Sequence, residues 1–163
     1  DPDMTRLEPV LRLVQAMIAG IPELEAKIIQ AVQVFWLSRQ STRAESRFVL
    51  LISALESLLL TQNDRDYLGH KLAEKAAFLL EQERDKRLDL SKRIKRYYGK
   101  RSDLMHTGQA SIREGDVRAV DNIFIGLAFR LLELTNSYDK MEQKSHDRDK
   151  EGIEDYIDSL KFG

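Results

Sequence analysis

The stretch that decides the expected fold is Tyr98-Gly99-Lys100-Arg101-Ser102-Asp103-Leu104-Met105-His106-Thr107-Gly108. It lies at the end of the most basic segment of the chain, and its arginine precedes its histidine by five positions. Histidine is the usual general acid or base near neutral pH. Arginine stays charged and can hold a phosphate through two parallel hydrogen bonds. Arg101 and His106 therefore bring together the side chains needed to attack a phosphodiester.

With its flanking residues, this stretch resembles the R-x4-6-H motif of the HEPN superfamily. The pattern Tyr-x-x-Arg-Ser-x-x-x-His-x-Gly is similar to the Apea-like branch of that superfamily. Upstream, Leu51–Leu59 resembles the helix with an Ala-Leu-Glu-x-Leu core that precedes the motif in this branch, and Lys71–Leu80 resembles the helix between the two. The resemblance extends from about Glu23 to the C-terminus. A bare R-x4-H spacing would carry little weight without these flanking residues.

The resemblance implies a metal-independent endoribonuclease that needs no cofactor and leaves 2′,3′-cyclic phosphate and 5′-hydroxyl ends. His106 would move the proton, and Arg101 would stabilise charge on the phosphoryl oxygens. Glu56 is the third catalytic candidate: it would orient Arg101 or share in proton transfer, or else pair with a buried arginine as a purely structural partner. Ser102 departs from the pattern, because active members often place Asn, Asp or His directly after the arginine.

The resemblance also implies partners. HEPN domains that cleave RNA typically form two-fold dimers in which both copies of the motif line one cleft, so we expect a homodimer or pairing with another such domain. The implied context is the effector of a prokaryotic toxin or antiphage defence system that cuts RNA such as tRNA, together with an antitoxin or other domains of a longer protein. The alternative is a HEPN module without catalysis that binds RNA or serves in dimerisation and regulation. A less favoured alternative is an all-helical domain whose C-terminal helix docks on a partner.

Composition indicates one soluble domain. The 163 residues are 42% hydrophobic and 33% charged, and they include no cysteine, which excludes disulfides and thiolate metal sites. No apolar run approaches the roughly 20 residues that span a bilayer, so we expect a cytoplasmic protein that does not enter a membrane. We expect residues 1–22 to form an N-terminal helix at the end of a preceding region, and residues 23–163 to form the HEPN-like domain.

Hydrophobic periodicity predicts an all-α fold, an up-and-down helical bundle of HEPN type with additional terminal helices. No stretch alternates with the period of a strand. A capping box formed by Ser41, Thr42 and Glu45 is expected to open one helix, and Gly108 is expected to end another. The predicted helices cover about 4–19, 22–39, 41–60, 66–83, 87–105, 114–138 and 147–160.

The predicted helix that ends at the motif is strongly basic. Residues 86–101 carry a net charge of +7, whereas residues 139–158 carry −4, so the overall charge of −1 hides a polarised chain. Such a cationic surface leading to Arg101 and His106 suits RNA. The alternative is a solvated helix face that pairs with the acidic C-terminal segment. The candidate RNA-binding residues are Lys92, Arg93, Arg96, Tyr97, Lys100 and Ser102.

Helix geometry limits how Arg101 and His106 can act together. Five residues of a straight helix separate two side chains by about 140° around the axis. The two side chains converge only if the helix ends between them, or if two chains combine their sites. Among the aromatic residues, Tyr98 is expected to pack beneath the motif, Tyr97 to be exposed and able to stack on a base, and Trp36 to be a packing residue.

The other two histidines, His70 and His146, are expected to have structural roles. No His, Asp or Glu spacing in the chain matches a metal-binding motif. No metal site is therefore predicted.

Overall fold

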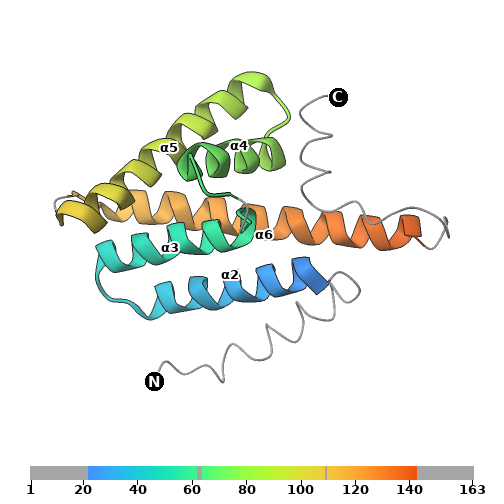
Figure 1. Cartoon of the computed structure of the whole chain (residues 1–163), viewed down its shortest axis with the longest axis horizontal. Helices are drawn as coiled ribbons and strands as arrows, with labels where there is room; N and C mark the ends of the chain where they lie inside the picture. The colour runs from blue at the N-terminus through green and yellow to red at the C-terminus, as the bar shows by residue number, and fades with distance from the viewer. Residues whose placement is uncertain (1–21, 62–63, 109, 143–163) are drawn as a thin grey trace.

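The computed structural model describes residues 22–61, 64–108 and 110–142, and within these ranges it is entirely helical (Figure 1). This confirms the prediction of an all-α helical bundle. The predicted helices at 4–19 and 147–160, and the domain boundary after residue 22, rest on segments outside the described residues. The helices are α2 Pro22–Gln40, α3 Ala44–Leu59, α4 Leu68–Leu80, α5 Arg84–Thr107 and α6 Glu114–Glu142.

Helix α3 is the centre of the bundle and contacts each of the other four helices. Its sequence repeats large apolar residues every three or four positions, which places them along a broad stripe of the helix surface. The apolar face predicted for this helix is confirmed, because all of its members are buried in the structure. They are Phe48, Leu51, Ile52, Leu55, Leu58 and Leu59.

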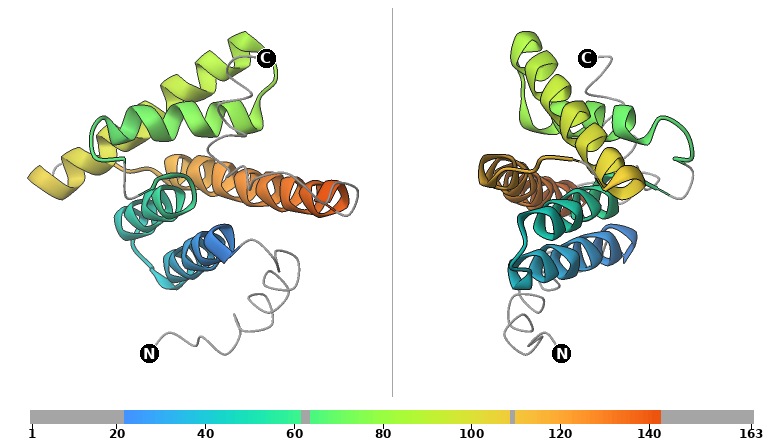
Figure 2. Two further views of the ribbon diagram at one scale, coloured as in Figure 1. Left: turned by 45° about the vertical axis from the view of Figure 1, so that its right-hand side comes forward. Right: turned by 90° about the vertical axis from the view of Figure 1, so that its left-hand side faces the viewer.

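The helices form two groups that meet at α3 and where α6 packs against α4 (Figures 1 and 2). Helices α2, α3 and α6 pack together on one side, and α4 with α5 forms a helical hairpin on the other. Phe35 of α2 stacks on Phe124 of α6 with ring centroids 4.5 Å apart. Phe48 of α3 meets the ring edge of Tyr97 of α5 at 6.1 Å. Aromatic contacts therefore tie α3 to the α4–α5 hairpin and α2 to α6.

The ends of two helices test the capping signals in the sequence. The predicted capping box is wrong: α3 begins at Ala44, its N-cap is Arg43, and no side chain caps it. The prediction for Gly108 is confirmed. This glycine adopts a left-handed conformation, with φ of 68°, and its N–H donates to the carbonyl of Leu104. Such a residue ends a helix sharply, and glycine accepts the conformation at least cost.

The connection from α3 to α4 is held by buried charge. Lys75 of α4 is only 6% exposed, and its ammonium donates to the carbonyl of Leu59, at the end of α3, and to the carboxylate of Asp64. Burial would raise the pKa of Asp64. Hydrogen bonds from the Thr61 N–H, Lys71 and Lys75 outweigh burial and hold this pKa well below its ordinary value. The position of α4 against α3 is therefore fixed by this cluster.

None of the helices in the described ranges is long and apolar enough to cross a lipid bilayer.

Candidate functional site

Arg101 and His106 both lie in the last two turns of α5. The helix runs without a break through Thr107, so it does not end between them. Arg101 is partly buried against α3, whereas the side chain of His106 is exposed. Within one chain, the described structure therefore does not bring the two side chains together.

The guanidinium of Arg101 is held on its buried side by Glu56 and Tyr98. Its Nη2 lies 3.4 Å from Oε2 of Glu56 on α3, and its Cζ lies 5.8 Å from the ring centre of Tyr98. The Nε–H is buried and has no hydrogen-bond partner. A guanidinium carries five N–H donors, and the described structure engages one of them. Arg101 is thus held in place, with 27% of its side chain exposed and donors still free.

Glu56 is placed where the sequence suggested, beside Arg101, and its charge also acts on the nearby phenol of Tyr98. Burial raises the pKa of Tyr98, and the charge of Glu56 raises it further against a smaller opposing effect of Arg101. The phenol therefore stays protonated at neutral pH. Tyr98 packs beneath Arg101, as predicted.

The end of α5 carries the exposed part of the motif. Figure 2 shows this end reaching beyond α4, and Met105 there is 59% exposed. The hydroxyl of Thr107 donates to the carbonyl of Asp103, which helps to close the last turn beside Gly108. His106 is thus presented on an ordered helix end, where its imidazole is open to a ligand or to another chain.

The predicted cationic stripe is present in part. Lys92, Arg93 and Arg96 are exposed, and the described structure shows no ion pair for any of them. Lys100 differs, because its Nζ lies 2.7 Å from the Asp116 carboxylate of α6. Burial would raise the pKa of Asp116, but the hydrogen bonds from Lys100 and from the Arg113 N–H outweigh burial and lower it, so the Asp116 carboxylate is ionised at neutral pH.

Two further candidates for RNA binding, Tyr97 and Ser102, are buried or half-buried in the structure. The prediction that Tyr97 is exposed is wrong: its ring is 5% exposed, since it packs against Phe48 and so cannot stack on a base. The sequence misled because two adjacent tyrosines on a helix point about 100° apart, and the pattern did not fix which one faces the core. Ser102 is half-buried beside Arg101.

His70 takes a surface contact and has no part in the site. Its Nε2 lies 2.8 Å from Nζ of Lys95, which removes that lysine from the free cations of α5. His146 lies outside the described residues.

Trp36 is half-buried with its indole N–H unpaired. Within the described ranges, no group of three or more His, Asp or Glu side chains is placed to hold a metal ion.

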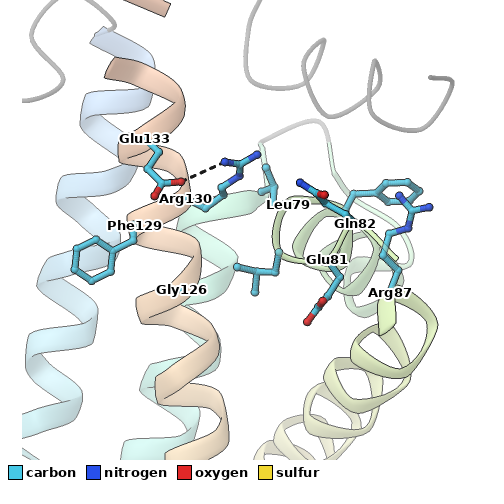
Figure 3. Close-up of a pocket in the computed structure, with 10 residues that line it drawn as sticks. Leu79, Glu81, Gln82, Arg87, Gly126, Phe129, Arg130 and Glu133 are labelled. Atoms are coloured by element: carbon cyan, nitrogen blue, oxygen red, sulfur yellow. Dashed lines mark hydrogen bonds and ion pairs between the residues drawn. The ribbon is translucent and has the colours of Figure 1, made fainter. Parts of the chain in front are cut away.

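Two surface hollows of the described ranges lie toward the beginning of α5, away from the motif. The larger, of about 510 Å³, is bounded by α4, α6 and Arg87 (Figure 3). Figure 3 shows Arg130 paired with Glu133 at its rim and Phe129 on the other side of α6. None of the predicted site residues lines it. The second, of about 480 Å³, is lined by Lys92 and Arg93 together with Lys86, Glu81 and Asp89, and is therefore of mixed charge.

Two residues of the site were not singled out from the sequence. Gly69 lies inside α4 where a Cβ would come within 2.6 Å of the Tyr98 ring. A glycine inside a helical pattern often has such a packing reason, and that signal was available. Asp116 accepts the Arg113 N–H at the start of α6, as an acid at the third helical position does, so its position also was readable from the sequence.

No protein-family model, no curated protein and no solved structure matches this chain.

Proposed function

We propose that this protein is a metal-independent endoribonuclease of HEPN type whose active site is built from two copies of the motif. The proposal rests on how Arg101 is held in the structure. Its guanidinium is anchored by Glu56 and Tyr98, it keeps free donors, and it lies on the same helix end as the exposed His106. The exposed cations Lys92, Arg93 and Arg96 extend back along that helix and suit a polyanion.

The reaction we propose is a transesterification followed by product release. The ribose 2′-oxygen loses its proton to a histidine and forms a bond to phosphorus, while the bond from phosphorus to the 5′-oxygen breaks. That oxygen takes up a proton from water and leaves as a 5′-hydroxyl, and the other product carries a 2′,3′-cyclic phosphate. The protonated histidine then returns its proton to water. Arg101 donates hydrogen bonds to the phosphoryl oxygens, where charge builds up.

The proposed site combines two chains. Within one chain Arg101 and His106 lie on different faces of the unbroken helix α5, so one copy does not place both side chains on the same phosphate. In a two-fold dimer the Arg101 of one chain would lie near the His106 of the other, and the two would act on one phosphate. The end of α5 reaches beyond α4 (Figure 2) and carries the exposed Met105, and we propose this end as the contact between copies.

The rival function is an RNA-binding or dimerisation module without catalysis. A specific observation favours it: Glu56 already pairs with Arg101, and His106 lies on a different face of the same helix in one chain. An arginine and a histidine with purely structural roles would be placed in the same way. The two functions differ in one measurable property, which is cleavage.

The test is a cleavage assay in EDTA with total RNA and a tRNA pool. Wild type is compared with Arg101→Ala and His106→Ala, and with the matched controls Arg65→Ala and His70→Ala, which remove exposed side chains of the same kinds outside the site. We expect wild type and both controls to produce cyclic phosphate ends. We expect either site variant to lower the rate at least about a hundredfold.

If every variant matches wild type, or if wild type is folded and dimeric but cleaves nothing, the enzyme proposal fails. RNA binding by that inactive wild type would then favour the module without catalysis. Cleavage that survives only without EDTA would contradict the metal-independent mechanism.

A further inference from the structure

Tyr67, the residue directly before α4, has an unusual backbone conformation for its residue type. Among the described residues it is the one non-glycine with a positive φ, and its φ and ψ are 54° and 36°. A Cβ makes this left-handed conformation unfavourable, and glycine or asparagine adopts it at lower cost. The Tyr67 carbonyl accepts the N–H groups of His70 and Lys71, so its backbone starts the helix. That role does not explain why the residue is a tyrosine.

The side chain of Tyr67 contributes little to the fold. It is 84% exposed, the highest value among the exposed large hydrophobic side chains of the described ranges. It makes no capping hydrogen bond to α4. An aromatic ring stabilises a fold mainly through the area it buries, and this ring buries almost none. Tyr67 thus presents a ring to solvent at a position where a smaller residue would fold at lower cost, which favours a role in binding.

The start of α4, where Tyr67 lies, is close to Arg101. Gly69 faces the ring of Tyr98 so closely that an added Cβ would lie 2.6 Å from Cδ1. The Cζ of Arg101 lies 5.8 Å from the centre of the same ring. Two residues of chain span at most about 7 Å, so Tyr67 begins α4 beside the part of α5 that holds Arg101. Figure 2 shows the start of α4 alongside α5, short of the C-terminal end of α5.

The surface around Arg101 has charge, but the aromatic residue expected there is buried. Proteins that bind single strands combine a cationic surface, which follows the phosphates, with aromatic rings on which bases stack. The exposed cations of α5 supply the charge. Tyr97 cannot supply the ring, because it is only 5% exposed. Tyr67 places an exposed ring on the neighbouring helix start.

We propose that Tyr67 is the base-stacking residue of this surface, and that the ligand is RNA with unpaired bases. While Arg101 contacts a phosphate, a nearby base of the same strand stacks on the Tyr67 ring. The bases of a duplex already stack on one another, so a duplex gains nothing from this ring. This inference rests on the function proposed above, because it assigns RNA to the surface around Arg101.

The first experiment removes the ring. Affinity is measured for a single-stranded 2′-O-methyl RNA oligonucleotide, which has no free 2′-hydroxyl and cannot be cleaved by this chemistry. We expect Tyr67→Ala to weaken binding about tenfold, within the range for one stacked base. Tyr67→Phe keeps the ring and should bind like wild type. The matched control is Phe129→Ala, which removes a 65% exposed ring of α6 outside the site and should leave affinity unchanged.

A second variant separates stacking from damage to the fold. Tyr67→Asn removes the ring but suits both the left-handed conformation and the start of a helix, where asparagine is a favoured cap. We expect this variant to raise the thermal unfolding midpoint and to weaken binding as much as Tyr67→Ala. A tyrosine that serves the fold predicts the opposite, a lower midpoint with unchanged affinity, and that pair of results would overturn the proposal.

The second experiment compares a single strand with a duplex. The same oligonucleotide is measured alone and after annealing to its 2′-O-methyl complement. We expect Tyr67→Ala to weaken binding of the single strand and to leave binding of the duplex unchanged, because only the single strand has a base free to stack. Equal losses for the two ligands would overturn stacking, since a general change in the surface acts on both.

The outcomes distinguish this inference from the proposed function. If wild type cleaves RNA and Tyr67→Ala matches it in affinity and rate, stacking is overturned and the ribonuclease stands. If wild type binds the single strand but cleaves no RNA, and Tyr67→Ala weakens binding of the single strand alone, stacking stands and the ribonuclease does not. If wild type neither binds nor cleaves RNA, both fail.

Discussion

At the scale of single residues, Lys75 and Asp64 show how this bundle tolerates charge in its interior. Each side chain is about a tenth exposed or less, yet each finds several partners at the junction of α3 and α4. An ion removed from water is stable only when such partners replace its hydration. The positive end of Lys75 also lies at the C-terminal end of α3, where a helix favours cations.

Removing this lysine should destabilise the protein strongly. Lys75→Met keeps much of the side-chain volume but leaves the Leu59 carbonyl unpaired and Asp64 without one of its cations. We expect a loss of about 3 kcal/mol in the free energy of unfolding, measured by chemical denaturation. Lys86→Met is the control, because its pair with Glu83 is exposed and should contribute less than about 1 kcal/mol. Equal losses for the two variants would contradict the role given to Lys75.

Asp64 should make the free energy of unfolding depend on pH in the acidic range. Its pKa lies below the ordinary value of 3.8 in the folded protein, so its ionised form is stabilised by folding. That contribution is complete above the unfolded pKa and is lost as the pH falls through the folded pKa. We expect the free energy of unfolding of wild type to fall below about pH 4. In Asp64→Asn we expect lower stability at neutral pH and a flatter profile in acid. Asp89→Asn, which changes an exposed carboxylate, should keep the steep wild-type profile.

At the scale of elements, the sequence predicted the existence and order of all the described helices. The apolar repeats of α3 and α6 made these assignments straightforward, because a broad stripe of large side chains has one stable arrangement. Helix ends were less well predicted. Helix α5 begins at Arg84, three residues before the expected start, because charged residues at its first turn carry no periodic signal.

The site was predictable as a set of residues but not as an arrangement. Glu56 and Arg101 are 45 positions apart, and their pairing depends on how α5 crosses α3. The same crossing buries Tyr97 and directs Tyr98 toward Glu56, which no local pattern distinguishes. Lys100 was expected in the free stripe because a helical wheel does not show that α6 begins beside it with Asp116.

The exposed cations of α5 should set the salt dependence of RNA binding. Binding of single strands loses about 0.7 in the slope of log affinity against log salt for each phosphate contact. We expect the triple change of Lys92, Arg93 and Arg96 to Ala to reduce this slope by about 2. The control changes Arg43, Arg65 and Arg130 to Ala, which removes the same charge from outside α5. A similar loss in the control would assign binding to total charge and exclude a defined stripe.

At the scale of the whole molecule, the proposed site requires two chains, and complementation tests this directly. Arg101→Ala and His106→Ala dimers should each be inactive. When the two proteins are mixed and allowed to exchange, about half of the dimers contain one chain of each kind. We expect RNA cleavage to reappear in the mixture, because such a dimer retains one Arg101 and one His106.

The control mixes Arg101→Ala with a chain that carries both substitutions, and this mixture should remain inactive. Activity of a wild-type monomer, isolated at low concentration and shown to be monomeric by light scattering, would overturn the two-chain site. Recovery in the first mixture alone would support it.

The unbroken course of α5 from Arg101 to His106 has a consequence for how such an enzyme would behave in time. A chain just released from synthesis would be fully folded yet harmless, since neither residue can serve the other within one copy. Below the dimer dissociation constant, the cleavage rate would rise with the square of the chain concentration. A modest change in the amount of protein made would then decide whether RNA is cleaved, and no separate inhibitor would be needed at low abundance.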